Sequence, residues 1–321
     1  MLSLQEVEDA AQVVYAAMPP TAQYAWPLLA RRTGCEVWVK HENHTPIGAF
    51  KVRGGLVYMD RVKRAAPALK GVISATRGNH GQSIAVGAAK VGIPATIVVP
   101  QGNSAEKNAA MRAFGAELVE AGHDFDAARD VAQRLASERG LAMIPSFHRD
   151  LVCGVATYAL ELFRGTPSLD TVYVPIGLGS GICGVIAMRD ALSPTTKVVG
   201  VVSTEAPAYA LSFAAGKVVP TNSADTMADG MAVRGPDAEA LAIILKGADR
   251  IVQVSDAEIA AAMRAYYEDT HQLTEGAGAA ALAALMQERE RMAGKRVALV
   301  LSGGNIDRPL YLRLLADRHP V

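Results

Sequence analysis

The chain has 321 residues, of which half are hydrophobic and a fifth are charged, and its 32 basic side chains equal its 32 acidic ones. This length allows two domains of about 150 residues each, and the composition is typical of a soluble enzyme. A chain without net charge has no general electrostatic attraction for nucleic acid, and no stretch approaches the ~18 apolar residues that span a bilayer, so we expect neither partner.

The N-terminus and the cysteines indicate a cytoplasmic protein. Residues 1–10 carry acidic side chains where a signal peptide has a basic segment followed by an apolar one. The three cysteines, Cys35, Cys153 and Cys183, are too widely spaced for a disulfide framework or a zinc knuckle. We therefore expect free thiols in a reducing compartment.

From residue 36 onward, short β-branched runs alternate with helical patterns, which indicates parallel strands covered by helices on both faces. No shift in composition marks a domain boundary, and the stretch 218–236 is expected to be irregular. Three residue pairs have the spacing of a capping box and predict helix starts: Ser3 with Glu6, Asn103 with Glu106 and Ser255 with Glu258. Eight runs are predicted as strands: 36–40, 71–75, 95–100, 117–120, 171–175, 197–203, 250–254 and 296–301.

The first candidate loop follows the predicted strand 36–40 and contains Lys51, preceded by Gly48 and Phe50. A single lysine is most often a solvated surface residue. The alternative is a Schiff-base lysine, whose amine must be held near a carbonyl group and be partly deprotonated to act as nucleophile and later as base. A helix start at this position disfavours the ammonium form.

The second loop, Thr76–His80, lies where the predicted strand 71–75 ends and a helix begins. Free backbone N–H groups at a helix start bind a carboxylate or a phosphate. Asn79 offers both a donor and an acceptor to a ring hydroxyl. His80 is either an acid–base group or a structural residue at a helix start, and the second interpretation is favoured.

The third loop, 177–184, has glycines at positions 177, 179, 181 and 184. Such glycines let the backbone approach a phosphate, whose charge the amides satisfy, and Ser180 adds a hydroxyl donor. The competing interpretation is a dinucleotide-binding fingerprint with Glu205 as the ribose-binding acid. That interpretation is disfavoured because the third glycine of the fingerprint falls on Ile182.

A fourth element, Ser302–Asn305, directly follows the predicted strand 296–301. Taken alone it is a tight turn, but Ser302 stands at the carboxyl end of a strand, where open α/β sheets bind ligands. With these four elements in this order, residues 20–310 resemble the pyridoxal 5′-phosphate (PLP) enzymes of fold type II, the tryptophan synthase β-like superfamily. Within it, the chain resembles the serine/threonine dehydratase and serine racemase branch.

The resemblance implies an α/β fold with two open, twisted, mostly parallel sheets flanked by helices. It implies a small domain, residues 67–148, which closes over the substrate and is inserted into a large PLP-binding domain, residues 1–66 plus 149–321. A homodimer is usual. The implied reaction begins when PLP acidifies the Cα–H bond of a β-hydroxy-α-amino acid and Lys51 removes the proton. Loss of water gives an enamine, which tautomerises to an imine, and hydrolysis of the imine by water releases ammonia and leaves a 2-oxo acid.

By the same resemblance, Lys51 is the catalytic residue and is covalently bound to PLP. The implied cofactor contacts are Phe50 beside the ring, Asn79 at the 3′-oxygen, Glu275 near the ring edge, Ser302 at the pyridine nitrogen, and Gly177, Leu178, Gly179, Ser180 and Gly181 around the phosphate. The implied substrate contacts are Thr76, Arg77, Gly78, Asn79 and His80.

The chain departs from the family pattern at several positions. The usual Thr-Gly-Ser-Phe-Lys reads Ile47-Gly48-Ala49-Phe50-Lys51, and Arg77 replaces the serine that acts on the face opposite the lysine in racemases. The acidic metal ligands of the racemase branch fall on Val202 and Ala208, so no metal site is expected.

These departures indicate a catabolic dehydratase that acts on threonine or serine, on phenylserine, on 3-hydroxyaspartate or on a hydroxyectoine breakdown product. Ile47 and Ala49 favour a larger apolar substrate if they line the pocket. Arg77 favours a second carboxylate if it points at Cβ.

Two other classes of function use the same residues. A cysteine-synthase-like β-replacement lyase differs only in whether a second nucleophile adds before the product leaves. A binding module derived from the family is disfavoured because Lys51, Asn79 and Ser302 are all retained. His44 and His148 are weaker candidates for the mouth of the site, and two methionines, Met227 and Met231, are interpreted as core residues.

Overall fold

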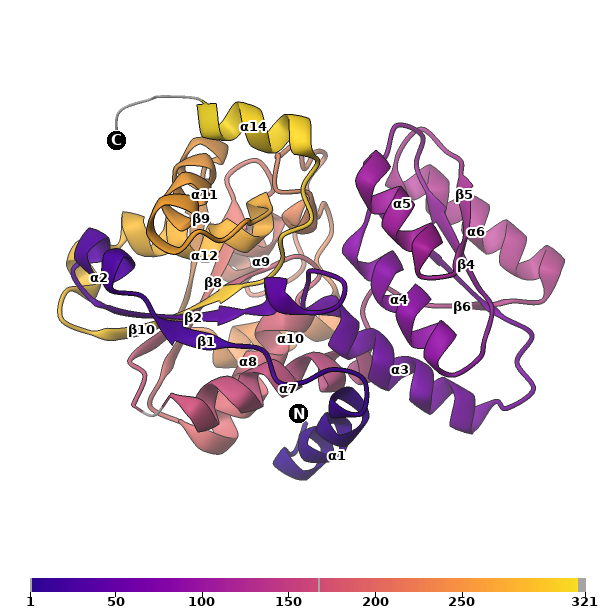
Figure 1. Ribbon diagram of the computed structural model, residues 1–321, viewed down its shortest axis with the longest axis horizontal. Helices are drawn as coiled ribbons and strands as arrows, with labels where there is room; N and C mark the ends of the chain where they lie inside the picture. Colours follow the sequence, from indigo (N-terminus) through magenta and orange to yellow (C-terminus); the bar gives the residue numbers. More distant parts are fainter. Residues whose placement is uncertain (1, 167, 317–321) are drawn as a thin grey trace.

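Over residues 2–166 and 168–316, which the computed structural model describes, the strands form two separate sheets (Figure 1). The larger sheet has the order β1-β2-β10-β7-β8-β9 and the smaller one the order β5-β4-β3-β6. The strands of the larger sheet are β1 (Gln23–Ala25), β2 (Glu36–His41), β7 (Thr171–Pro175), β8 (Lys197–Ser203), β9 (Arg250–Val254) and β10 (Arg296–Leu301). Those of the smaller sheet are β3 (Val72–Ala75), β4 (Ala95–Val99), β5 (Glu117–Glu120) and β6 (Ala142–Met143).

Nearly all strand pairs are parallel. Only β1 runs antiparallel to its neighbour β2 within the described residues, with Gln23 opposite Lys40. β10 lies between β2 and β7 and pairs in parallel with both, and β8 and β9 continue the sheet. All pairs of the smaller sheet are parallel. The predicted fold class is therefore confirmed, because buried parallel strands leave near-continuous apolar runs in the sequence.

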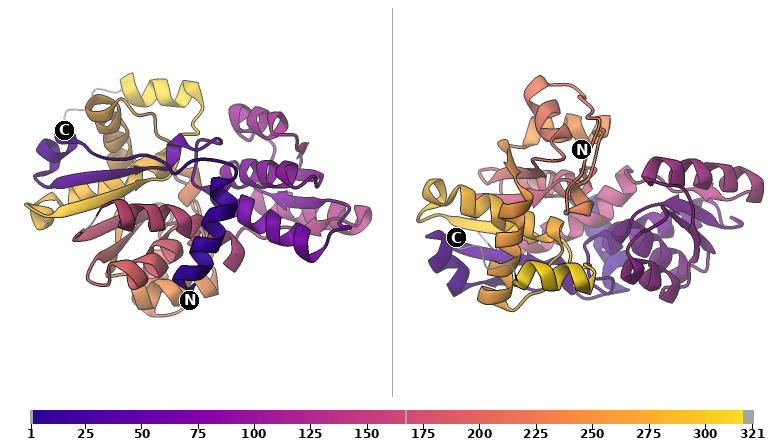
Figure 2. Two further views of the ribbon diagram at one scale, coloured as in Figure 1. Left: turned by 60° about the horizontal axis from the view of Figure 1, so that its bottom comes forward. Right: turned by 90° about the horizontal axis from the view of Figure 1, so that it is seen from above.

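Helices cover both sheets, and the two sheets lie side by side in all three views (Figures 1 and 2). α4, α5 and α6 surround the smaller sheet, whereas α3 packs against both α4 and α7 and so links the two halves. The helices are α1 (Leu4–Tyr15), α2 (Pro27–Thr33), α3 (Lys51–Ala65), α4 (Asn79–Lys90), α5 (Ala105–Ala113), α6 (Phe125–Arg139), α7 (Arg149–Gly165), α8 (Ser180–Leu192), α9 (Ala208–Ala215), α10 (Ala238–Gly247), α11 (Asp256–Thr270), α12 (Gly276–Gln287), α13 (Arg289–Met292) and α14 (Arg308–Ala316), with 3-10 turns η1 (Glu42–His44) and η2 (Asp229–Met231).

Two of the three predicted capping boxes are present. Ser3 and Ser255 accept from the third backbone N–H of α1 and α11, and the glutamate at each of those positions bonds back. The predicted capping box of Asn103 and Glu106 is wrong. α5 is capped one residue later by Ser104, whose hydroxyl accepts from the Lys107 N–H at 3.1 Å.

Most of α12 is buried, from Gly276 to Leu285, and it packs against β7–β10. Its small side chains let the helix approach the sheet closely, which accounts for the uncharged Gly- and Ala-rich stretch in the sequence. In the described part of the chain, no helix is long and apolar enough to cross a membrane. Cys35, Cys153 and Cys183 are free and buried.

Candidate functional site

A cavity of about 1250 Å³ lies beside the carboxyl ends of strands from both sheets. β3 ends at Ala75, β7 at Pro175 and β10 at Leu301, and residues that follow each of them line the cavity. Every predicted catalytic, cofactor-binding and substrate-binding residue contributes to its wall. These residues are Phe50, Lys51, Thr76, Arg77, Gly78, Asn79, His80, Gly177, Leu178, Gly179, Ser180, Gly181, Glu275 and Ser302.

Lys51 is the first residue of α3, and its amine is held beside the glycine-rich loop. The Nζ atom donates to the Ser180 hydroxyl at 3.1 Å and lies 4.9 Å from the centroid of the Phe50 ring. Burial lowers the pKa of Lys51 to about 8, although the Glu275 carboxylate acts in the opposite direction. The amine is therefore more readily neutral than that of a surface lysine, as nucleophilic or basic chemistry requires.

The loop before Lys51 is held from two directions. The Thr45 hydroxyl donates to the Ala49 carbonyl at 2.8 Å and accepts from the Ala49 N–H at 2.9 Å. The Phe50 N–H donates to the Ser302 carbonyl at 3.0 Å, and Ala49 forms an isolated β-bridge with Gly303. Ser302, at the end of β10, thus lies next to the lysine loop.

The glycine-rich loop 177–181 joins β7 to α8 in a conformation that side chains would obstruct. Gly179 caps α8 with a left-handed φ of 99°, and a Cβ at Gly177 would lie 2.4 Å from the Gly230 carbonyl oxygen. The first backbone N–H groups of a helix have no intrahelical partner and lie at the positive end of its dipole. The start of α8 therefore suits a phosphate group.

Asn79 connects the start of α4 to Glu275, which precedes α12, and to Asn305, which follows β10. Its amide donates to Glu275 Oε1 at 2.7 Å, and its carbonyl oxygen accepts from Asn305 at 2.8 Å. Glu275 is the N-cap residue of α12 and is buried. Lys107 of α5 completes the group, with its Nζ 3.7 Å from Glu275 Oε2 and 2.5 Å from Asp229.

Glu275 and Lys107 shift each other's pKa values. Burial raises the pKa of Glu275, and the Lys107 ammonium partly opposes the rise. Burial would lower the pKa of Lys107, but the Glu275 and Asp229 carboxylates outweigh it, so the pKa is raised. The carboxyl group of Glu275 can therefore hold a proton at a pH where an exposed glutamate cannot.

His80 lines the same cavity as a neutral imidazole. Burial, with a smaller contribution from the Lys51 charge, lowers its pKa to about 3. Its Nε2 atom is buried and has no hydrogen-bond partner among the described residues. A buried polar atom without a partner is uncommon in proteins, which distinguishes this nitrogen from most buried polar atoms.

Several residues at the cavity have no signal in the sequence. Lys107 and Asp229 line it and pair with each other across 122 positions of sequence. Arg234, from the irregular stretch 218–236, forms an ion pair with Asp126 of α6. Neither pair follows from a motif, because each forms only when the two sheets lie together.

The structure does not meet the condition for a larger apolar substrate, which was that Ile47 and Ala49 line the pocket. Ile47 and Ala49 are buried, with 3% and 0% exposure, and neither lines the cavity. The argument for a larger apolar substrate therefore loses its basis. Arg77, in contrast, is exposed and lines the cavity.

Four weaker candidates are also placed by the structure. His44 and His148 do not line the cavity, and His148 instead caps α7. Met231 is a buried core residue at the cavity wall, and Met227 packs against the same core.

Three features of the cavity fit PLP. The loop 177–181 offers backbone amides at a helix start for the phosphate, and side chains at Gly177 and Gly179 would collide with Gly230 and Ala240, so the loop conformation requires glycine there. The Lys51 amine has a lowered pKa, as a Schiff-base lysine requires. Polar atoms of His80 and Glu275 are buried without a hydrogen-bond partner among the described residues.

Comparisons with known proteins agree with this fit. The profile of the family described as pyridoxal-phosphate dependent enzyme matches residues 16–303. An L-threonine ammonia-lyase of Geobacter sulfurreducens is 38% identical over 87% of this chain and 69% of its own length. An L-threo-3-hydroxyaspartate ammonia-lyase of Saccharomyces cerevisiae is 32% identical over 98% of this chain and 96% of its own. The structure of maize serine racemase superposes with a TM-score of 0.91 at 26% identity, covering 97% of this chain and 96% of that one.

Proposed function

This chain belongs to the pyridoxal-phosphate dependent enzymes, and we propose that it is a dehydratase that converts a β-hydroxy-α-amino acid to a 2-oxo acid and ammonia. The main support is that the Lys51 amine lies 3.1 Å from the Ser180 hydroxyl, beside a glycine-rich loop at the start of α8. The named ammonia-lyases among the relatives support the same reaction.

Residues already at the cavity wall would hold PLP. The N–H groups of loop 177–181 would bind its phosphate, and Asn79, Glu275 and Ser302 would meet the ring. When bound, PLP withdraws electrons from the substrate's Cα and so makes its proton easier to remove. Lys51 would take that proton, since its lowered pKa leaves part of the amine neutral near pH 7 to 8. The backbone N–H groups at the start of α4 would bind the substrate carboxylate.

We propose that residues 67–148 form a small domain that closes over the substrate, and that residues 1–66 and 149–321 form the large domain. Three polar contacts that join α5 and its N-cap Ser104 to η2 and to the start of α14 support a closing contact surface. Lys107 pairs with Asp229, the Ser104 hydroxyl contacts Asp307 at 2.5 Å, and Glu106 accepts from the Arg308 N–H at 3.0 Å. Closure of this surface would exclude water from the reacting atoms.

Among the substrates considered, 3-hydroxyaspartate has specific support from the cavity. Arg77 lines it with an exposed side chain. A guanidinium binds a second carboxylate through two parallel hydrogen bonds. Ile47 and Ala49 lie outside the cavity wall, so phenylserine has no comparable support. Threonine and serine remain the simpler alternatives.

A substrate panel tests the proposed reaction. L-Threonine, L-serine, phenylserine and 3-hydroxyaspartate are each incubated without added thiol, and both 2-oxo acid and ammonia are measured. We expect equal amounts of the two products from at least one substrate, and none with the matched Lys51→Ala variant. Products that form only when a thiol is supplied would identify a β-replacement lyase instead.

We also propose that the enzyme is a cytoplasmic homodimer. The buried free thiols of Cys35, Cys153 and Cys183 suit a reducing compartment. Sedimentation or light scattering at micromolar concentration measures the oligomeric state directly, and a monomeric mass would contradict the second half of this proposal.

A further inference from the structure

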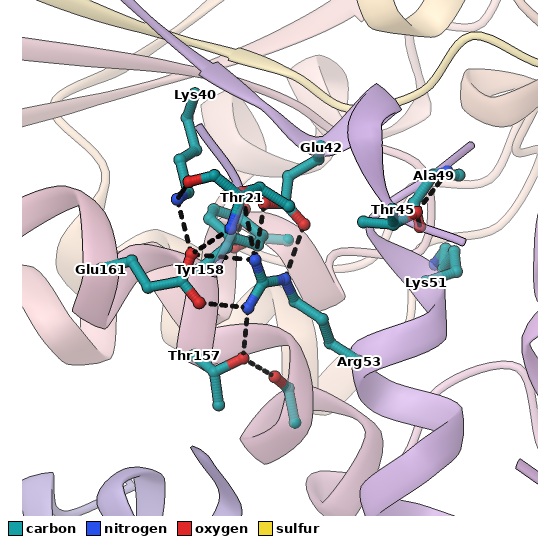
Figure 3. Close-up of polar contacts among 12 residues, drawn as sticks. Thr21, Lys40, Glu42, Thr45, Ala49, Lys51, Arg53, Thr157, Tyr158 and Glu161 are labelled. Atoms are coloured by element: carbon teal, nitrogen blue, oxygen red, sulfur yellow. Dashed lines mark hydrogen bonds and ion pairs between the residues drawn. The ribbon is translucent and has the colours of Figure 1, made fainter. Parts of the chain in front are cut away.

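Four buried charged side chains, Lys40, Glu42, Arg53 and Glu161, form a compact group beside the lysine loop (Figure 3). We call this group the charge cluster. The side chains of Lys40, Glu42 and Arg53 have no exposed surface, and that of Glu161 is 7% exposed. Two cations and two anions leave the cluster without net charge, and no member of it lines the cavity.

Arg53 is the centre of the charge cluster, since its guanidinium binds both carboxylates in the two-pronged geometry. It donates to the two oxygens of Glu42 at 2.7 and 2.9 Å and to those of Glu161 at 2.6 and 2.9 Å. The Thr157 hydroxyl accepts another bond at 3.0 Å, and Lys40 donates to Glu161 at 2.5 Å. A planar guanidinium forms such a set with fixed angles, which an ammonium group cannot reproduce.

Glu42 and Arg53 stand on either side of Lys51 in the sequence. Glu42 begins η1, directly before the lysine loop, and Arg53 lies in the first turn of α3, directly after it. Their ion pair therefore joins the two ends of the segment 42–53. Because the pair fixes both ends of this segment, it restricts where the Lys51 amine can lie.

The helix α7 extends the charge cluster to the phosphate loop. Thr157 and Glu161 of α7 bind Arg53, and Tyr158 between them donates its hydroxyl to the Gly181 carbonyl at 3.1 Å. The Tyr158 ring also contacts the Phe50 ring edge-on, with centroids 6.0 Å apart. One helix thus holds the base of the lysine loop and the glycine-rich loop together.

The backbones of α3 and α7 touch without side chains between them. A Cβ at Gly154 of α7 would lie 2.3 Å from the Arg53 carbonyl oxygen. A shift of one helix is therefore passed directly to the other.

Fold stability alone does not account for this arrangement. Burying four charges carries a large desolvation penalty, and well-packed apolar residues of similar volume are often equally stabilising. What apolar residues lack is the fixed angular geometry of the two-pronged pairs.

We propose that Arg53 and Glu42 are positioning residues: the charge cluster sets the Lys51 amine in register with the loop 177–181. The proposal rests on the proposed function in that Lys51 is taken as the residue that holds PLP and moves the Cα proton. Neither residue lines the cavity, so they act through the position of Lys51 relative to the loop 177–181.

The test is the charge-balanced double variant Glu42→Gln/Arg53→Met, studied as the holoenzyme. It removes one anion and one cation and leaves the Lys40–Glu161 pair intact. A misplaced reacting group can lower a rate about 100-fold, so we expect kcat to fall ~10- to 100-fold with KM within about threefold. We also expect the dissociation constant of PLP, measured by absorbance, to rise at least ~10-fold.

The matched control is Glu288→Gln/Arg250→Met. Arg250 and Glu288 form another two-pronged, partly buried pair, which lies away from the cavity wall. We expect this variant to lose thermal stability while kcat and PLP affinity stay within twofold of the parent. If the cluster variant also keeps both within twofold, the positioning role is refuted and the cluster is structural.

One further variant and one further comparison separate the positioning role from the proposed function. Arg53→Lys retains the charge and folds more easily, and we expect it to show a smaller loss of kcat and PLP affinity in the same direction. An unchanged Arg53→Lys variant would also refute the role of the two-pronged geometry. If the parent binds PLP but turns over no substrate of the panel, the proposed function fails, whereas PLP affinity still decides whether the cluster positions Lys51.

Discussion

Replacing Lys51 by methionine in the PLP-free protein measures how strongly the site opposes a charged amine. Burial lowers the pKa of this lysine from 10.5 to about 8. Because one pKa unit corresponds to about 1.4 kcal/mol, a charged Lys51 costs the folded protein about 3 kcal/mol at pH 7. The cavity admits water and screens part of this cost, so we expect Lys51→Met to raise the free energy of unfolding by about 1–3 kcal/mol at pH 7.

The pH dependence separates this effect from simple apolar packing. Below pH 8 the lysine is protonated in both the folded and the unfolded chain, so the whole penalty is present. Between pH 8 and 10.5 the unfolded chain binds more protons than the folded one, so the stability of the parent rises with pH. Above pH 10.5 both forms are neutral and the penalty is gone. The advantage of methionine should therefore shrink across this interval.

The free energies of unfolding of the PLP-free parent and Lys51→Met variant are measured by urea unfolding, monitored by circular dichroism, at pH 7 and near pH 10.5. The difference between the two proteins is compared at the two pH values. Lys217→Met is the matched control, since Lys217 is exposed, and its effect on stability should not change with pH. An equal gain for Lys51→Met at both pH values would show that the methionine acts by packing. The inference that the site favours a neutral amine would then be wrong.

Four other outcomes are expected. Ser302→Asp should protonate the pyridine nitrogen of bound PLP. We expect this variant to show an added long-wavelength absorbance band during turnover and a shift of products toward transamination or racemisation. An unchanged spectrum and product ratio would place residue 302 away from the ring. Arg77 stays protonated and cannot accept a Cα proton, so substrate recovered from deuterated buffer should keep its configuration at Cα. Arg77→Ala should lower kcat/KM for 3-hydroxyaspartate at least ~10-fold, the value of a charge-assisted bond, and change that for threonine less than threefold. Activity should survive a chelator, since Val202 and Ala208 carry no ligand oxygen in their side chains, and recovery only on addition of magnesium would contradict this.

Much of the fold could be predicted because the signals are local. The eight predicted strands all exist, most within one residue of their expected bounds, since a buried parallel strand is an apolar β-branched run. β1 and β6 were not predicted, because strands of three and two residues are too short to show a pattern. The spacing of Asn103 to Glu106 fits the capping box and therefore predicts a helix cap at Asn103. The backbone instead starts the helix one residue later.

The candidate residues could be brought together from sequence because each follows a strand or starts a helix. The loops after β7 and β10 meet because parallel strands end at the same edge of one sheet. The loop after β3 belongs to the other sheet and joins them because the two sheets lie side by side. Adjacency along the chain was a poorer guide. Ile47 and Ala49 neighbour Lys51, yet the bridge from Ala49 to Gly303 turns this part of the loop into the core.

The electrostatics of the site lay beyond sequence reasoning because they arise from three elements at once. The charge of Glu275, at the start of α12, raises the pKa of Lys51 at the start of α3, whereas burial lowers it. Lys107, from α5 beside the other sheet, in turn favours the charged form of Glu275. The protonation state of Lys51 therefore depends on contacts between elements of both halves of the molecule, and no motif around Lys51 carries that information.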